Sequence, residues 1–227
     1  MLINPNQMKK VLAFNGSPRR FGNTSILLQH FRRGTEINTT SFKEVLMNDL
    51  KLDFCNGCLR CNLIGRCSIS GDDWNEISKQ ILESDVLVFA SPVYFHHLAG
   101  PMKVLIDRFR SFVKVQITES GLKHVPWQPW NKEFVLLLSM GSSNDSDASS
   151  IIELFYYMIN ILGPKNKLSI VTATRLAVIR QVEKTEEELT VLYPKLGLSH
   201  ELAKSDAEKN KKVLDDCYNL GLEKTRT

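Results

Sequence analysis

Four of the five cysteines in this 227-residue chain are clustered in one short segment: Cys55, Cys58, Cys61 and Cys67. The spacing C-x2-C-x2-C-x5-C lets thiolates on a tight loop converge on one soft metal centre, with glycines between them to permit the bends. Structural zinc usually uses two separated C-x2-C pairs, whereas three cysteines at three-residue steps are closer to an iron–sulfur run. These residues alone are compatible with an iron–sulfur cluster, with a zinc ion, and with free or oxidised thiols. Cys217, in a charged segment, is interpreted as a structural thiol.

The segment GSPRRFGNTS (residues 16–25) joins a short apolar run to a stretch with helical spacing. Free amides at a helix N-terminus, together with the helix dipole, favour a phosphate group, and Arg19 adds a guanidinium. Further hydroxyl and amide groups come from Ser17, Asn23, Thr24 and Ser25. The spacing matches neither the Walker motif nor G-x-G-x-x-G, so the segment predicts a phosphate site of another kind. An ordinary capped turn is the alternative.

Two more polar loops follow apolar runs. In SPVYFHHLAG (residues 91–100), the adjacent Tyr94 and Phe95 suit one face of a flat ring, with core or interface packing as the alternative. His96 and His97 point apart on an extended loop, and no catalytic role is assigned to them. The small residues of SMGSSND (residues 139–145) permit close approach of the backbone to a ring edge.

The elements that position these loops are read from hydrophobic periodicity. Strands are predicted at residues 10–15, 44–47, 85–90, 133–140 and 168–173. Helices are predicted at 23–33, 72–84, 101–113, 149–162, from 183 onward, and after 199. This alternation predicts a parallel sheet covered on both faces, with ligands at the carboxyl ends of its strands. Residues 114–131 are expected to be a long connection.

Composition and charge exclude several classes of protein. The net charge of +4 is too small and scattered to indicate nucleic-acid binding. No apolar run approaches the roughly 20 residues of a membrane span, and residues 1–10 lack the apolar core of a secretory signal. We expect a cytoplasmic protein that binds neither nucleic acid nor membrane. Its domain would span residues 1–180, with residues 181–227 as a helical extension of the same domain.

Together, the three loops and the cysteine segment resemble a known family. GSPRRFGNTS and SPVYFHHLAGPMKVLIDRF are similar to motifs of the flavodoxin-fold NAD(P)H-dependent FMN reductases, and CNGCLRCNLIGRCSISGDDW resembles their iron–sulfur flavoprotein branch. The resemblance covers roughly residues 9 to 145. It implies a flavodoxin-like, doubly wound, five-stranded parallel sheet with helices on both faces.

The resemblance also implies the ligands. The FMN phosphate would contact Ser17, Arg19, Asn23, Thr24 and Ser25. The isoalloxazine would lie against Pro92, Val93, Tyr94 and Phe95, with Gly141 and Ser142 closing another edge. A 4Fe-4S cluster would be ligated by Cys55, Cys58, Cys61 and Cys67.

The function implied is an FMN-dependent oxidoreductase that passes electrons between a 4Fe-4S cluster and FMN, with no catalytic residue assigned. NAD(P)H is the expected electron donor, and a redox partner protein or a small molecule the expected acceptor. A homodimer or homotetramer is expected, because the two centres can meet across a subunit interface in this family. The alternatives are a cluster-free NAD(P)H-dependent FMN or quinone reductase, and a non-enzymatic flavin- or metal-binding regulatory module.

Several other residues are interpreted as structural. Asp72 and Asp73 are expected to cap the helix that follows them. Asp107 and Arg108 match a family motif, and are expected to form an ion pair on a helix surface. Trp127 and Trp130 are expected to be packed in the interior, with lining the space above the flavin as the alternative.

Overall fold

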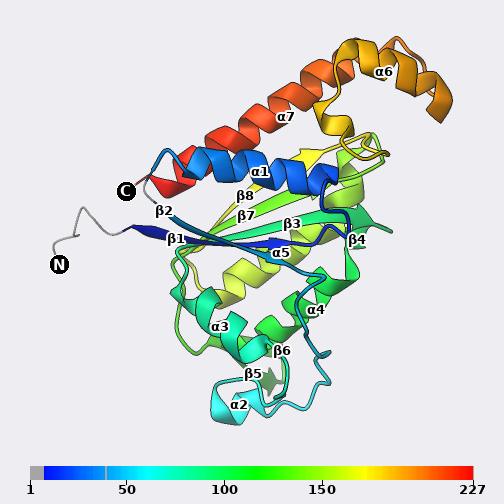
Figure 1. Ribbon diagram of the computed structural model, residues 1–227. Coiled ribbons are helices and arrows are strands. Elements are labelled where there is room, and N and C mark those ends of the chain that lie inside the picture. Colours follow the sequence, from blue (N-terminus) through cyan, green and yellow to red (C-terminus); the bar gives the residue numbers. More distant parts are fainter. Residues whose placement is uncertain (1–7, 39, 227) are drawn as a thin grey trace.

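The computed structural model describes residues 8–38 and 40–226, and has a parallel sheet between two layers of helices (Figure 1). The strand order is β2-β1-β3-β7-β8, with all four neighbouring pairs parallel. The strands are β1 (Lys9–Asn15), β2 (Thr40–Leu46), β3 (Val86–Tyr94), β7 (Glu133–Ser139) and β8 (Lys167–Ala173). The predicted doubly wound five-stranded sheet is confirmed. Most of the segment expected to lack a secretory signal lies outside the described residues.

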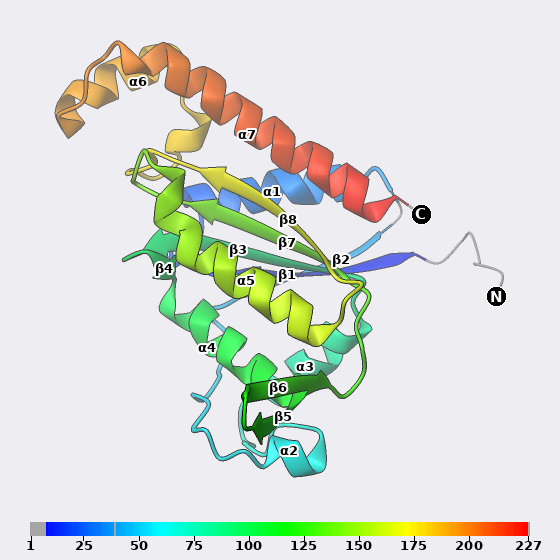
Figure 2. The ribbon, with the colours of Figure 1, turned by 180° about the vertical axis from the view of Figure 1, so that it is seen from behind.

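Helices cover both faces of the sheet, as predicted (Figures 1 and 2). One face carries α1 (Asn23–Thr35) and α7 (Leu202–Thr225). The other carries α3 (Trp74–Glu83), α4 (Gly100–Arg108) and α5 (Ser149–Leu162). Two short helices are α2 (Cys61–Ile64) and α6 (Glu186–Leu192), and 3-10 turns occur at Phe109–Phe112, Asp145–Ala148, Gln181–Glu183 and Tyr193–Leu196. Among the described residues, no helix combines the length and apolar character needed to span a membrane.

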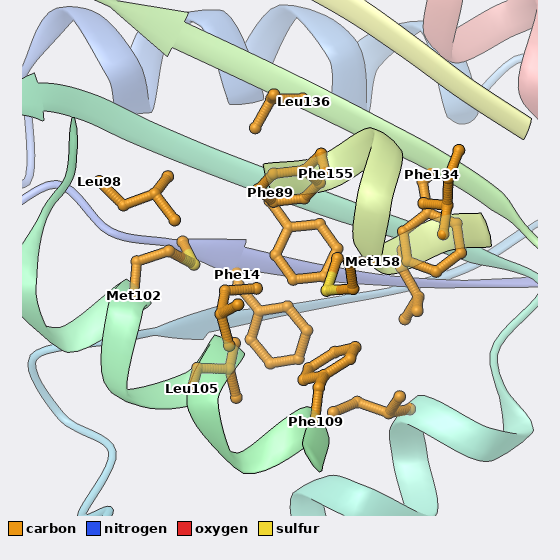
Figure 3. Close-up of a cluster of buried hydrophobic side chains, with 14 of the residues drawn as sticks. Phe14, Phe89, Leu98, Met102, Leu105, Phe109, Phe134, Leu136, Phe155 and Met158 are labelled. Atoms are coloured by element: carbon orange, nitrogen blue, oxygen red, sulfur yellow. The ribbon is translucent and has the colours of Figure 1, made fainter. Parts of the chain in front are cut away.

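The central strands are buried on both faces, which explains their continuous apolar runs. Successive side chains alternate between the two helical layers, so Phe89 packs toward α4 and α5 while Val88 packs toward α1 and α7. Figure 3 shows Phe89 between Phe14 and Phe155, with ring centroids 5.4 Å and 5.0 Å away. This packing holds rigid the strands whose ends carry the predicted loops.

Residues 114–131, expected to be a long connection, contain an antiparallel hairpin of β5 (Val113–Thr118) and β6 (Gly121–Pro126). Most of its side chains are at least partly exposed, so no apolar periodicity marked its strands. The hairpin lies beside α2 and the cysteine loop (Figure 2). Trp130 is packed in the core as predicted, whereas Trp127 is 43% exposed.

Two glycines allow α7 to lie directly against α1. A Cβ on Gly221 would lie 2.0 Å from the carbonyl oxygen of Phe31, and a Cβ on Gly34 would lie 2.0 Å from that of Tyr218. Cys217 is fully buried on α7, and this burial raises the pKa of its thiol to about 12. Cys217 is therefore a packing residue, while the domain division at residue 180 stays a prediction.

Replacing Gly221 with alanine is expected to lower the free energy of unfolding by about 3 kcal/mol, because the new methyl group meets backbone that cannot rotate away. Urea unfolding would measure the change. Asn219→Ala, on the exposed side of the same helix, is the control and should change stability by less than about 0.5 kcal/mol. Equal stability of the G221A variant and the unmodified chain would contradict the close packing of α1 and α7.

Candidate functional site

The loops after β1, β3 and β7 gather at the carboxyl edge of the sheet (Figure 1). The amide of Gly16 donates to the carbonyl of Ala90 at 2.8 Å, which joins the first loop to β3. The buried hydroxyls of Thr24 and Ser139 are 2.6 Å apart, which joins the start of α1 to the end of β7. The structure thus brings together three loops that are far apart in the sequence, at the edge where doubly wound sheets bind ligands.

The first loop is a tight turn that leads into α1. The Ser17 hydroxyl accepts from the Arg19 amide at 3.2 Å and donates to the Arg19 carbonyl at 2.9 Å. Gly22 lies against this turn so closely that a Cβ there would be 2.8 Å from the Ser17 hydroxyl. Within the described residues, no side chain caps the first turn of α1, so its amides are available to an anion.

Four of the five predicted phosphate ligands already have hydrogen-bond partners: Ser17 bonds to Arg19 and Thr24 to Ser139, and Asn23 and Ser25 are engaged as well. Asn23 donates to the carbonyl of Val178 at 2.9 Å and accepts from the amide of Val182 at 3.1 Å. The hydroxyl of Ser25 donates to the carbonyl of Arg19 at 3.2 Å. These buried side chains hold the loop in place, while the Arg19 side chain is exposed beside the helix start. The phosphate contacts assigned to the five residues stay a prediction.

The second loop is shorter than expected, because β3 continues to Tyr94. The chain then turns back, and the two-residue strand β4 (His97–Leu98) pairs with the end of β3. Phe95 and His96 form the turn, with φ angles of +53° and +61°. Positive φ at both central residues is typical of a type I′ turn, which favours Asn-Gly. The turn leaves Tyr94 half exposed and Phe95 fully exposed.

The backbone strain at this turn leads to a prediction. Replacing Phe95-His96 with Asn-Gly is expected to raise the free energy of unfolding by about 1 kcal/mol or more, since bulky residues at positive φ are strained. The same change removes the exposed ring, so FMN affinity should fall. Thermal unfolding and a flavin fluorescence titration would measure both changes. A variant with unchanged affinity would contradict the predicted ring contact of Phe95.

The remaining predicted flavin residues lie in β3 and in the loop after β7. Pro92 is buried and Val93 half-buried within β3. Gly141 is exposed, and a Cβ there would meet no atom within 4 Å. The carbonyl of Ser142 accepts from the amide of Arg175 at 2.7 Å, which fixes the third loop to the segment after β8.

The cysteine loop leaves the sheet after β2 and returns at α3. Its two ends, at Asp53 and Asp72, lie close together at what we call the neck of the loop, and a buried ion pair joins them there. Arg108 is 0% exposed, and its Nη1 donates to Asp72 Oδ2 at 2.5 Å and to the carbonyl of Asp53 at 2.7 Å. The expected surface pair of Asp107 with Arg108 is therefore wrong, since Asp107 pairs with Lys103 at 2.6 Å. Arg108 instead ties together the two ends of the loop.

The two aspartates after the cysteines differ in role. Asp72 Oδ1 accepts from the amide of Trp74 at 3.2 Å, at the start of α3, as a cap would. The predicted cap at Asp73 is wrong, because its carboxylate accepts from the amide of Lys51 at 2.7 Å and not from a helix amide. This contact adds a second closure to the neck of the loop.

Asp72 makes the neck sensitive to acid. Burial raises the pKa of its carboxyl, but hydrogen bonds from Arg108 and two backbone amides outweigh burial and hold this pKa below its usual range. The ionised Asp72 therefore stabilises the fold above the unfolded pKa of about 3.9, and this contribution is lost as the pH falls through the lower folded pKa. We expect the stability difference between the unmodified chain and Asp72→Asn, measured by urea unfolding, to shrink below about pH 4. A constant difference would exclude Asp72 as the titrating group.

All four clustered cysteines line one cavity of ≈ 230 Å³, together with Arg108 and Arg110. Cys55 and Cys58 are exposed, Cys67 is half-buried and Cys61 is buried. Left-handed backbone at Gly57 and Gly65 makes the bends expected of these glycines, and Leu59 adopts the same conformation with φ of +57°. The four cysteines therefore share one cavity, while their role as cluster ligands stays a prediction.

The thiols of the cavity differ in their surroundings. Burial raises the pKa of Cys61, while the nearby Arg110 acts in the opposite direction. A hydrogen bond from Ser68, 3.5 Å from the sulfur, lowers the pKa of the exposed Cys58. In the described ranges, no three His, Cys, Asp or Glu side chains are close enough together to hold one metal ion.

The carboxyl edge of the sheet carries the groups that a flavin phosphate and ring would contact. The uncapped amides of α1, the Gly22 contact and the exposed aromatic turn fit a molecule with a phosphate and a flat ring, as FMN has. The four thiols that line one cavity are the donor type that a soft, multi-iron centre takes, and the cluster itself stays a prediction. The sequence did not indicate that Arg110 contacts a thiol, and it predicted Arg108 on the helix surface, where the structure has it buried. No local pattern marks either, because both act on residues distant in the sequence.

Comparisons with known proteins agree with this geometry. Residues 9–166 match the family model described as NADPH-dependent FMN reductase. An iron-sulfur flavoprotein of Archaeoglobus fulgidus is 34% identical over 99 residues, which cover 44% of each chain. One of Methanocaldococcus jannaschii is 36% identical over 101 residues, covering 44% of this chain and 52% of the relative. The matched part thus spans about half the length of these curated relatives.

Solved structures show the same fold. An azoreductase of Bacillus anthracis aligns with a TM-score of 0.63 at 15% identity, covering 95% of this chain and 100% of that one. An NAD(P)H:quinone oxidoreductase of Methanothermobacter marburgensis aligns with a TM-score of 0.63 at 13% identity, covering 96% and 97%. Because the family model covers more than half of the sequence, the chain belongs to the NADPH-dependent FMN reductase family.

Proposed function

We propose that this protein is an FMN-dependent oxidoreductase that passes electrons between FMN at the carboxyl edge of the sheet and a 4Fe-4S cluster in the cysteine loop. The observation that carries the proposal is the shared cavity of Cys55, Cys58, Cys61 and Cys67, closed at its neck by the buried Arg108–Asp72 pair. The names of the archaeal relatives agree with this combination of centres.

In this proposal the chain binds and orients the flavin, and FMN, when bound, supplies the chemistry of hydride and single-electron exchange. The amides at the start of α1 and the Arg19 side chain hold the phosphate. Tyr94 and Phe95 lie against the ring, and the backbone around Gly141 approaches its edge. The four cysteines ligate the cluster.

The first test is an anaerobic purification followed by an absorption spectrum and assays of FMN, iron and acid-labile sulfide. A two-centre protein contains FMN together with about four irons per chain. Cys58→Ser should lose iron and keep FMN, while Cys217→Ser, which removes a thiol far from the cavity, should keep both. FMN without iron in the unmodified chain would contradict the cluster.

A second candidate is a cluster-free NAD(P)H-dependent FMN or quinone reductase. The family description favours it, and so does the exposure of Tyr94 and Phe95 in the loop predicted to contact the flavin. In that case the cysteines would be thiols, and NAD(P)H oxidation would persist in the C58S variant. FMN binding without NAD(P)H oxidation would favour the other alternative, a non-enzymatic flavin- or metal-binding regulatory module.

We propose a homodimer or homotetramer, with a redox partner protein or a small molecule as acceptor, in the reducing cytoplasm. Large apolar side chains are exposed around the cysteine loop and the hairpin, including Phe54 at 77%, Leu63 at 85% and Ile117 at 85%. Such surface is typical of protein contacts. Sedimentation of the holoprotein tests this, and a monomer at micromolar concentration would contradict it.

A further inference from the structure

Arg110 reaches the cysteine cavity from the 3-10 turn after α4. Its Nη1 donates to the sulfur of Cys61 at 3.5 Å, and the same residue lines the cavity shared by the four cysteines. Cys61 is the buried member of the four, so this contact lies where little water screens the charge. A guanidinium is thus held against the sulfur that solvent reaches least.

The position of the Arg110 guanidinium is fixed by two further hydrogen bonds. Nη1 also donates to the carbonyl of Val113 at 2.8 Å, and Nη2 donates to Asn62 Oδ1 at 2.8 Å. Asn62 is itself held by the amide and the carbonyl of Val115, at 3.0 Å and 2.9 Å. This network connects the loop helix α2 to the hairpin and leaves the guanidinium little freedom to turn away.

The buried Arg108 and the half-buried Arg110, which both line the cavity, differ in charge balance. Arg108 is neutralised by Asp72, with which it forms the buried ion pair. Arg110 forms no ion pair with a carboxylate in the part of the chain that the structure describes, and its acceptors are a carbonyl, an amide oxygen and the thiol sulfur. Its positive charge is therefore uncompensated and faces the cysteines.

We propose that Arg110 is a positioning residue that raises the reduction potential of the cluster proposed for this loop. The inference rests on the proposed function. If the cluster accepted one electron from the flavin after NAD(P)H had reduced it, the flavin would lose one electron, no bond to the cluster would form or break, and the cluster with its thiolates would gain one negative charge. A fixed cationic donor on a ligand sulfur stabilises the more negative state, so it favours electron transfer from flavin to cluster.

The test is an anaerobic redox titration of the holoprotein, in which the reduced cluster is followed by electron paramagnetic resonance and FMN by absorbance. Arg110→Gln removes the charge, and the equilibrium constant for cluster reduction should fall about ten-fold, the size of one charge-assisted hydrogen bond. A ten-fold change is about 59 mV for a one-electron couple, here to more negative potential. The FMN potentials in the same sample should not move.

Two further variants separate charge from general disturbance. Arg66→Gln removes the same charge from an exposed residue next to Cys67 and should leave the midpoint unchanged. Arg110→Lys keeps the charge without the planar fork and should shift the midpoint less than R110Q. Iron and sulfide contents are measured for every sample, so that each midpoint refers to an intact cluster.

Failure of the proposed role of Arg110 and failure of the proposed cluster give different results. An unmodified chain without iron after anaerobic purification overturns the proposed cluster and this role of Arg110 with it. A normal iron content with the same midpoint in R110Q overturns the role of Arg110 alone. An equal shift in R66Q also overturns it, because the effect would then be one of overall charge. Loss of iron in both R110Q and R110K would show a role in cluster assembly and overturn the role in potential.

Discussion

Replacing Arg108 with methionine is expected to lower the free energy of unfolding by about 3–5 kcal/mol and to abolish iron incorporation. Methionine leaves the Asp72 carboxylate buried without its cation, and such unpaired burial is costly. The carbonyl of Asp53 also loses its donor, so the link that Arg108 makes between the two ends of the cysteine loop is lost. Urea unfolding and the iron content of anaerobically purified protein measure the two effects.

A matched control comes from the neighbouring residue. Asp107→Asn breaks the exposed pair with Lys103, and should cost less than about 1 kcal/mol and leave iron content unchanged. The double variant R108M/D72N removes the unpaired carboxylate charge and should regain part of the lost stability. Equal effects of R108M and D107N would show that the neck pair does not organise the loop.

Replacing Gly22 with valine is expected to weaken FMN binding by about 100-fold or more. A Cβ at this position would be 2.8 Å from the Ser17 hydroxyl and 3.1 Å from the Arg19 carbonyl, so the turn must open. Opening the turn moves the first amides of α1 and the Arg19 side chain away from the position proposed for the FMN phosphate, and the loss of two charge-assisted hydrogen bonds would account for a change of this size. Flavin fluorescence titration of the FMN-free chain measures the affinity.

Gly100→Val is the control, because a Cβ at Gly100 would meet no atom within 4 Å. It should bind FMN as the unmodified chain does, and G22V should keep the cooperative unfolding of the fold. An FMN affinity that is unchanged in G22V would show that the phosphate does not lie at the start of α1.

Local sequence patterns were sufficient for most of the fold. The apolar runs predicted β1 and β7 to within a few residues because buried parallel strands are apolar on both faces. The exposed hairpin of β5 and β6 carries no such signal, and the strained turn at Phe95 and His96 contradicts the usual preference for Asn-Gly. Local rules therefore failed where solvent exposure or strain sets the conformation.

The sequence by itself determined the order of strands and helices, the three polar loops and the cysteine spacing. These features depend on residues that are neighbours in the chain, where helical and strand periodicities act. Only the tertiary structure decided that Arg108 pairs with Asp72, that Arg110 lies against Cys61, and that Gly221 lets α7 contact α1. Each of these contacts joins residues far apart in the sequence, and their pairing depends on how packed elements exclude water and neutralise buried charge.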